Sequence, residues 1–147
     1  VENLTPPLAQ KWSVHFGQPI SYPLIADGRV FVTVKNSIGH GTRLFALDAT
    51  NGSTLWARPL GGTFWWSAAC YENGRVFALN NDGLLFAFDG ATGMLIWVIK
   101  LPGQFFFDAP PTAASDTGHA FDTAEVMISS RMQSIGGLVT CANSCLK

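Results

Sequence analysis

Charged residues are scarce in this sequence. They make up 13% of the 147 residues, whereas 48% are apolar, and the 9 lysines and arginines nearly balance the 10 aspartates and glutamates. The formal net charge is therefore −1 at pH 7. A protein that binds nucleic acid needs a basic surface, because neutralising the phosphates supplies much of the affinity. The composition therefore argues against nucleic acid as a main partner.

Long apolar runs are also missing. No stretch approaches the roughly 20 consecutive apolar residues that a membrane-spanning helix needs, so the sequence predicts no transmembrane segment. The chain begins at Val1 and shows no basic segment followed by an apolar core of the kind that marks a signal peptide. We expect that any signal peptide has already been removed from this chain.

Cysteine is rare, and its spacing is not that of a metal site or a disulfide framework. The three cysteines are Cys70, Cys141 and Cys145. No pair has the Cys-x-x-Cys spacing of a zinc site, and we interpret Cys141 and Cys145 as two unrelated thiols. The three histidines lie too far apart in the sequence to form a short-spaced metal pair. The sequence therefore predicts no metal site, and it does not identify a catalytic or cofactor-binding residue.

Glycine, proline and aromatic residues are plentiful. The chain has 15 glycines and 8 prolines scattered among phenylalanine, tryptophan, valine and leucine. This mixture favours many short strands joined by tight turns over helices. The composition therefore predicts an all-β fold.

One segment of the sequence occurs twice. “LFALDATNGSTLW” (44–56) is followed 41 positions later by “LFAFDGATGMLIW” (85–97). Upstream, “DGRVFVTV” (27–34) matches “NGRVFALN” (73–80) at an offset of 46, so the first copy has five extra residues around 35–41. The shared frame consists of Ala46, Asp48, Gly52 and Trp56 in the first copy and of Ala87, Asp89, Gly93 and Trp97 in the second.

Each copy divides into four apolar runs separated by turn residues. Asp27-Gly28, Asn73-Gly74 and Asp82-Gly83 supply the positive φ angles that tight hairpins require. Each copy is therefore predicted to be a four-stranded antiparallel meander. The predicted strands lie near 20–26, 29–34, 43–48, 54–60, 65–71, 75–79, 84–89 and 94–100.

Such a meander cannot bury both of its faces alone, so the copies are expected to stack as the blades of a β-propeller. In a blade, the repeated Asp suits the turn before the last strand, because its carboxylate accepts backbone N–H groups, and the repeated Gly suits a positive φ angle there. Trp56 and Trp97 are expected to be equivalent and largely buried between adjacent blades, so that Trp97→Ala would cost about 3 to 5 kcal/mol. Trp12 stands 44 residues before Trp56 and fits the same position of a preceding blade.

The two copies resemble a known family. “ALDATNGSTLW” (46–56) and “AFDGATGMLIW” (87–97) are similar to the tryptophan-docking motif of pyrroloquinoline-quinone-type (PQQ-type, quinoprotein-like) β-propeller repeats. The resemblance covers about residues 8–114. It implies a bacterial, periplasmic or secreted protein. Enzymes of this family bind PQQ with a calcium ion and use a catalytic Asp, and the resemblance implies the same cofactors here. No residues of this sequence match the calcium ligands or the catalytic Asp. No cofactor is therefore predicted from the residues, and PQQ or calcium is implied by the resemblance alone.

The sequence is expected to contain two regions. Residues 1–114 hold the end of one blade, two full blades and the start of a third, and residues 115–147 form a divergent C-terminal segment without the repeat frame. Within the second region, a helix from about 123 to 134 and a disordered tail are both conceivable. A frameshifted or truncated gene is a further hypothesis for this departure from the repeat.

Two aromatic clusters form a candidate apolar binding surface. “TFWWS” (63–67) and “QFFFD” (104–108) occupy equivalent places at the entry to the first strand of their units. The side chains proposed for this surface are Trp65, Trp66, Phe106 and Phe107. Packing between blades is the alternative role. “NNDG” (80–83) is interpreted as a hairpin turn rather than as a set of calcium ligands.

Two classes of function remain open, together with the question of whether the protein is an enzyme at all. The first is a non-enzymatic propeller module that binds or scaffolds other molecules at the cell envelope, with protein or a small apolar ligand as partner. The alternative is an enzyme, either a PQQ-dependent dehydrogenase fragment or a calcium-dependent propeller hydrolase or lactonase. Because 147 residues make only about three and a half blades of a propeller that has typically four to eight, self-association into a dimer or larger species is expected.

Overall fold

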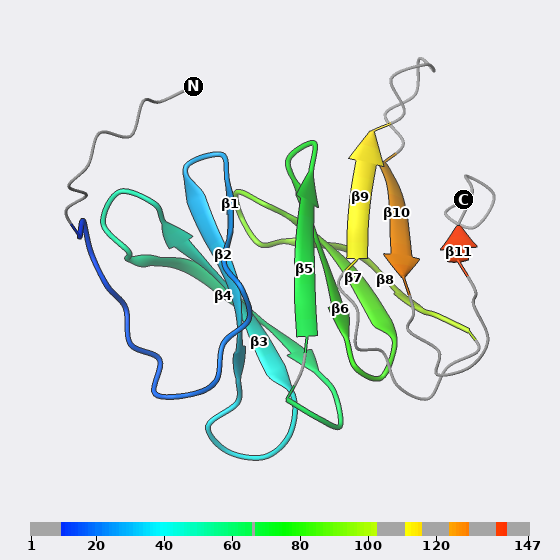
Figure 1. Cartoon of the computed structure of the whole chain (residues 1–147), viewed down its shortest axis with the longest axis horizontal. Coiled ribbons are helices and arrows are strands. Elements are labelled where there is room, and N and C mark those ends of the chain that lie inside the picture. Colours follow the sequence, from blue (N-terminus) through cyan, green and yellow to red (C-terminus); the bar gives the residue numbers. More distant parts are fainter. Residues whose placement is uncertain (1–9, 66, 103–110, 116–123, 130–137, 141–147) are drawn as a thin grey trace.

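The computed structural model describes residues 10–65, 67–102, 111–115, 124–129 and 138–140, and this part of the chain is built from strands (Figure 1). The first sheet has the order β1-β2-β3-β4 and the second the order β5-β6-β7-β8, each antiparallel and consecutive in sequence. The strands of these two sheets are β1 (Leu24–Ala26), β2 (Arg29–Lys35), β3 (Thr42–Asp48), β4 (Thr54–Gly61), β5 (Ser67–Glu72), β6 (Arg75–Asn80), β7 (Leu84–Asp89) and β8 (Leu95–Lys100).

The hairpins form where the turn residues predict them, although at Asp82-Gly83 only Gly83 has a positive φ angle, of 80°. Between β1 and β2, Asp27 and Gly28 both have positive φ angles, of 46° and 69°. Between β5 and β6, Asn73 and Gly74 do the same, with φ angles of 48° and 78°. Two successive positive φ angles give a turn whose twist matches that of the flanking strands. The all-β fold and the two four-stranded meanders expected from the sequence are thereby confirmed.

The strand β1 is shorter than expected. It begins at Leu24 instead of near residue 20, and Ile20 makes only an isolated bridge with Val34. Pro23 interrupts the strand because its nitrogen carries no hydrogen to donate to a neighbouring strand. The segment before β1 therefore lies along β2 without forming a continuous strand.

A third sheet follows, with the order β11-β10-β9. Its strands are β9 (Pro111–Ser115), β10 (Ala124–Ser129) and β11 (Leu138–Thr140). The helix conceived for 123–134 is therefore wrong over 124–129, and the rest of that range lies outside the described residues. Residues 124–128 of β10 pair with β9, and this pairing decides the structure of the segment against local helix propensity. The boundary predicted at 114/115 falls inside β9, and the division into two regions stays a prediction.

The three sheets stand side by side, as the blades of a propeller do (Figure 1). The inner strand of the second sheet, β5, contacts β1 and β2 of the first sheet and β9 of the third. Successive side chains of β6 point to opposite faces of the second sheet. Val76 and Ala78 pack against the first sheet, and Phe77 and Leu79 pack on the other face. The core therefore lies between the sheets, and each sheet needs a neighbour to bury its face.

Candidate functional site

Two tryptophans make the same contact with the blade that follows them. The indole N–H of Trp12 donates to the carbonyl of Ala49 at 3.0 Å, and that of Trp56 donates to the carbonyl of Gly90 at 3.1 Å. Each indole also lies directly against a glycine of the same turn. A Cβ added to Gly52 would lie 2.7 Å from Cε3 of Trp12, and a Cβ added to Gly93 would lie 2.5 Å from Cδ2 of Trp56. The repeated Trp and Gly thus meet across blade boundaries.

The repeated aspartates hold the turns that receive these indoles. The Asp48 carboxylate accepts from the backbone N–H of Thr50 and from its hydroxyl, and the Asp89 carboxylate accepts from the N–H groups of Ala91 and Thr92 and from the Thr92 hydroxyl. The Thr50 side chain lowers the pKa of Asp48, and the Thr92 side chain lowers that of Asp89. Both carboxylates are engaged within their own turns.

Trp97 differs from Trp56, although the two are equivalent in register. Trp56 lies opposite Ala46 and Trp97 opposite Ala87, but Trp56 is 7% exposed whereas Trp97 is only partly buried. The expectation that Trp97 is largely buried is therefore wrong. Its indole packs on Phe77 at 5.8 Å between ring centroids.

The “NNDG” segment connects a hairpin to the link between the two blades. Asn80 donates to the Leu60 carbonyl at 2.9 Å, Asn81 accepts from the N–H of Phe64 at 3.2 Å, and the Asp82 carboxylate accepts from the N–H of Thr63. The Asn80 and Asn81 side chains are fully buried. Their oxygens therefore serve the protein itself. Across the described residues, no group of three or more His, Cys, Asp or Glu side chains is placed to hold a metal ion.

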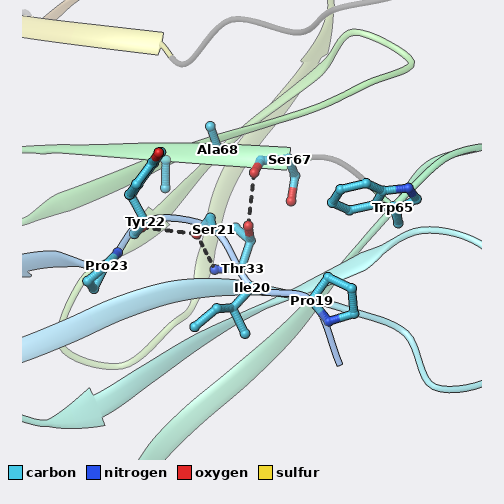
Figure 2. Close-up of a pocket in the computed structure, with 10 residues that line it drawn as sticks. Pro19, Ile20, Ser21, Tyr22, Pro23, Thr33, Trp65, Ser67 and Ala68 are labelled. Carbon is cyan, nitrogen blue, oxygen red and sulfur yellow. Dashed lines mark hydrogen bonds between the residues drawn. The ribbon is translucent and has the colours of Figure 1, made fainter. Parts of the chain in front are cut away.

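A pocket of about 820 Å³ opens between the inner strands of the first two blades (Figure 2). We call it the inter-blade pocket. It is formed by the segment before β1, by the start of β5 with the residues that precede it, and by one side chain of β2. The lining residues are Pro19, Ile20, Ser21, Tyr22, Pro23, Thr33, Trp65, Ser67, Ala68 and Ala69.

Aromatic rings stand at both ends of the inter-blade pocket, and hydroxyl groups lie between them. Tyr22 is 97% exposed and Trp65 is 52% exposed, and Figure 2 shows them on opposite sides of Thr33 and Ser67. The lining contains no carboxylate, lysine, arginine or histidine. This arrangement suits an uncharged ligand with apolar groups at its two ends.

The hydroxyl groups of the pocket are partly satisfied. Thr33 donates from Oγ1 to the Ser67 carbonyl at 2.9 Å, and its backbone N–H donates to Ser21 Oγ at 3.0 Å. Ser67 is 3% exposed, and its Oγ finds no hydrogen-bond partner in the described part of the chain. A buried hydroxyl without a hydrogen-bond partner costs free energy.

Of the four side chains proposed for an apolar binding surface, the structure places Trp65 in this pocket, whereas Trp66, Phe106 and Phe107 lie outside the described residues. Sequence reasoning missed the contribution of the first blade. The repeat could have indicated this contribution. The offset of 46 that aligns 27–34 with 73–80 also aligns 19–21 with 65–67 in the sequence. The first of these stretches has no aromatic run to draw attention to it.

Four-stranded antiparallel sheets in sequence order, packed face to face with a repeated Trp at their boundaries, define part of a β-propeller. Residues 40–120 match the sequence family described as outer membrane protein assembly factor BamB, with PQQ-type repeats. The match covers more than half of the chain, so the chain belongs to this family. Comparison with curated protein sequences gives no match.

Three solved structures of similar fold illustrate the comparison. BamB from Moraxella catarrhalis has a TM-score of 0.58 at 21% identity, and the alignment covers 82% of this chain and 33% of that one. A europium-containing methanol dehydrogenase has a TM-score of 0.56 at 18% identity, over 74% of this chain and 19% of that one. The quinohemoprotein alcohol dehydrogenase ADHIIG from Pseudomonas putida HK5 has a TM-score of 0.52 at 20% identity, over 74% and 16%.

At these identities the likeness to solved structures extends to the fold alone. The chain spans a third or less of the length of the proteins that it matches. Among the described residues, no helix has the length and apolar character needed to cross a membrane.

Proposed function

We propose that the chain is a non-enzymatic propeller module that binds other protein chains at the cell envelope and that it acts in the periplasm or as a secreted protein. The observation that carries this proposal is the family match over residues 40–120, because the family is described as an outer membrane protein assembly factor. The BamB structure from Moraxella catarrhalis, whose fold resembles this chain, supports the same choice.

The inter-blade pocket supports a binding role. Its two exposed rings, Tyr22 and Trp65, offer large apolar area at low cost in side-chain entropy. The side chains of Thr33 and Ser67 lie between the rings but are buried, so a bound segment would meet mainly the two rings and the exposed apolar lining around them. An extended protein segment combines apolar side chains with uncharged amide groups, which is the combination that this lining suits.

The residues of the inter-blade pocket can be compared with the needs of PQQ and calcium, the cofactors that the family resemblance implies. Pyrroloquinoline quinone is an anionic molecule, and the residues of the inter-blade pocket include no lysine, arginine or histidine to pair with its carboxylates. Calcium prefers several carboxylate and carbonyl oxygens, and the oxygens of Asn80, Asn81 and Asp82 bond within the protein. These described residues therefore do not fit pyrroloquinoline quinone with calcium.

Binding is tested with the whole chain and a pocket variant. The purified chain is immobilised and exposed to detergent-solubilised envelope proteins of the source organism, beside the variant Tyr22→Ser/Trp65→Ser. Leu55→Ser is the control, because Leu55 is also exposed but lies on β4, outside the pocket. We expect specific proteins to bind the native chain and the control and to be lost from the pocket variant.

The enzymatic alternative is tested in parallel. The chain is incubated with PQQ, calcium and an electron-accepting dye in the presence of alcohols, and separately with calcium and a panel of lactones and esters. The proposal predicts neither dye reduction nor acid release. Activity that a chelator abolishes would overturn it in favour of the dehydrogenase or the hydrolase.

A further inference from the structure

The two complete blades differ at one hairpin. In the second blade, β6 and β7 are joined by the short Asn81 to Gly83 turn, whereas in the first blade β2 and β3 are joined by the longer loop 36–41. The strands on either side correspond, because Thr33 pairs with Leu44 as Leu79 pairs with Leu85. The second blade shows that the fold does not need the longer loop.

In the second blade, this hairpin closes the surface beneath it. Asn80 and Asn81 are buried and bond to the link that leads into β5. Asn80 donates to the Leu60 carbonyl, and Asn81 accepts from the N–H of Phe64. Gly62 has a φ angle of +104°, and a Cβ there would lie 2.6 Å from Asn81 Oδ1. The hairpin and the link are therefore in close contact.

In the first blade, the corresponding place is open. Val34 and Lys35 stand where the second blade has Asn80 and Asn81, and the loop side chain Asn36 bonds back to the His40 carbonyl at 2.7 Å instead of to the link. The result is a pocket of about 500 Å³, which we call the loop pocket. It is lined by Phe16, Gln18, Val34, Lys35, Asn36, Ser37, Ile38, Arg43, Phe45 and Pro59.

The loop pocket has an apolar floor and a basic rim. Phe16 and Phe45 pack together at 5.0 Å between ring centroids and continue the buried cluster that contains Val34. Ile38, in the middle of the loop 36–41, is 90% exposed. Lys35 and Arg43 are the charged residues of the lining, and neither has an ion-pair partner in the part of the chain that the structure describes.

We propose that the loop pocket binds a peptide segment of a partner protein in which an apolar side chain is flanked by aspartate or glutamate. The apolar side chain enters between Phe45, Ile38 and Pro59, and the carboxylates pair with Lys35 and Arg43. Charge complementarity carries this choice, because both charged groups of the lining are cations without an ion-pair partner among the described residues. The site goes beyond the proposed function, since it is separate from the inter-blade pocket and its occupant is acidic.

A membrane surface is a weaker fit. Stable attachment to anionic lipid requires a broad apolar face or a cluster of about four to eight basic residues. The loop pocket offers one highly exposed apolar side chain, Ile38, and two cations. Its concave shape also suits a single inserted side chain better than a flat surface.

The proposal is tested on an array of nine-residue capped peptides. Each has a central Leu, Phe or Trp, flanked on both sides by Asp and Glu, by their neutral counterparts Asn and Gln, or by Lys. The labelled full chain is applied, and dissociation constants of the strongest sequences are measured by fluorescence anisotropy. We expect the acidic peptides to bind about tenfold more tightly than the neutral ones, as charge-assisted hydrogen bonds predict.

Substitutions then locate the site. Arg43→Glu should abolish the preference for acidic flanks and shift it toward lysine, and Ile38→Ser should weaken all peptides. Lys11→Glu is the matched control, because it changes the net charge equally at an exposed residue outside the loop pocket. Circular dichroism of each variant verifies the fold, and the exposed position of Arg43 on β3 makes its replacement compatible with folding.

Several results would overturn the proposal. Equal binding of acidic and neutral peptides, or no selective binding in the array, would contradict it. Arg43-dependent binding to phosphatidylglycerol vesicles that exceeds binding to any peptide would assign the site to a membrane instead. A dimer that dissociates on Arg43→Glu would assign it to a second copy of the chain. Trp65→Ser should leave peptide binding unchanged, so failure of the inter-blade pocket and failure of the loop pocket are distinguishable.

Discussion

The indole of Trp56 in the first blade donates to the carbonyl of Gly90 in the second, at 3.1 Å. Arg58, on the same strand, lies over this ring at 5.9 Å and donates from Nε to the Gly93 carbonyl at 2.7 Å. Two side chains of β4 therefore hold one turn of the next blade. This relationship fixes the two blades beside each other, and the inter-blade pocket exists because they keep that arrangement.

Truncation of the two equivalent tryptophans should have unequal effects. Trp56→Ala removes a buried indole and its hydrogen bond and should lower the free energy of unfolding by about 3 to 5 kcal/mol. Trp97→Ala should cost roughly half as much or less, because Trp97 is only partly buried. Urea unfolding followed by circular dichroism measures both. Equal losses would contradict the difference in burial.

Two glycines with nearly the same backbone angle form a matched pair for a second prediction. Gly93 has a φ angle of +67°, and a Cβ added there would lie 2.5 Å from Cδ2 of Trp56. Gly28 has a φ angle of +69°, and a Cβ added there would have no atom within 4 Å. Both alanine variants pay for the positive φ angle, at about 1 to 2 kcal/mol. Gly93→Ala should cost about 1 to 3 kcal/mol more, because the indole must move.

The comparison of the two variants isolates the contact with the indole. Thermal or urea unfolding of Gly93→Ala and Gly28→Ala under identical conditions supplies the difference. The account requires the Gly93 variant to be the less stable of the two. If Gly28→Ala lowered the free energy of unfolding as much as Gly93→Ala does, the close approach of Trp56 to the turn would make no contribution to the difference in stability.

Alkaline pH should weaken the contact between the blades at Tyr71. Burial and the hydrogen bond that its hydroxyl donates to Asp27 of the first blade raise the pKa of Tyr71 to about 12. The folded protein therefore holds this proton more tightly than the unfolded chain, whose tyrosine has a pKa of about 10. The stabilisation is complete below pH 10 and is lost as the pH rises toward 12.

Tyr71→Phe tests this pH dependence. The variant should be less stable than the native protein at neutral pH and should lose less stability between pH 10 and 12, as measured by unfolding at a series of pH values. Tyr22→Phe is the control, because Tyr22 is almost fully exposed. Parallel curves for the native protein and Tyr71→Phe would show that the bond to Asp27 does not stabilise the fold.

The apolar surface of β8 predicts self-association, which we propose on physical grounds. Leu95, Ile96 and Val98 are exposed on this strand, and β8 is the last strand of its sheet. An exposed apolar edge strand promotes pairing with another chain. Light scattering should report a dimer or a larger species at micromolar concentration. A monomer that unfolds cooperatively would contradict this prediction.

Much of the fold could be predicted from the repeat. The spacing of Asp, Gly and Trp and the Asp-Gly and Asn-Gly turns predict the meander of each blade, because local turn chemistry and strand alternation determine a hairpin. The strand β10 could not be predicted in this way, since it depends on pairing with β9. The short β1 was missed because the effect of Pro23 on a strand depends on which edge it occupies.

The pockets were harder to predict than the fold. Trp65 was visible in the sequence as part of an aromatic run, but its counterpart Tyr22 stands 43 residues earlier in an unremarkable stretch. The loop pocket depends on a difference between the blades, namely the five extra residues around 35–41. That insertion was apparent in the alignment of the two copies, whereas the space beneath it emerges only when Phe16, Phe45 and Pro59 are brought together in three dimensions.

The central claim is that the protein binds other protein chains in the inter-blade pocket, and photo-crosslinking tests it most directly. Benzoylphenylalanine is introduced at position 22 in the pocket and, as control, at position 53 in the exposed turn between β3 and β4. The account predicts that position 22 crosslinks in the envelope to a defined partner protein, that Trp65→Ser abolishes this product, and that position 53 does not form it. Equal crosslinking from both positions, or a product that persists in the Trp65→Ser variant, would contradict the claim.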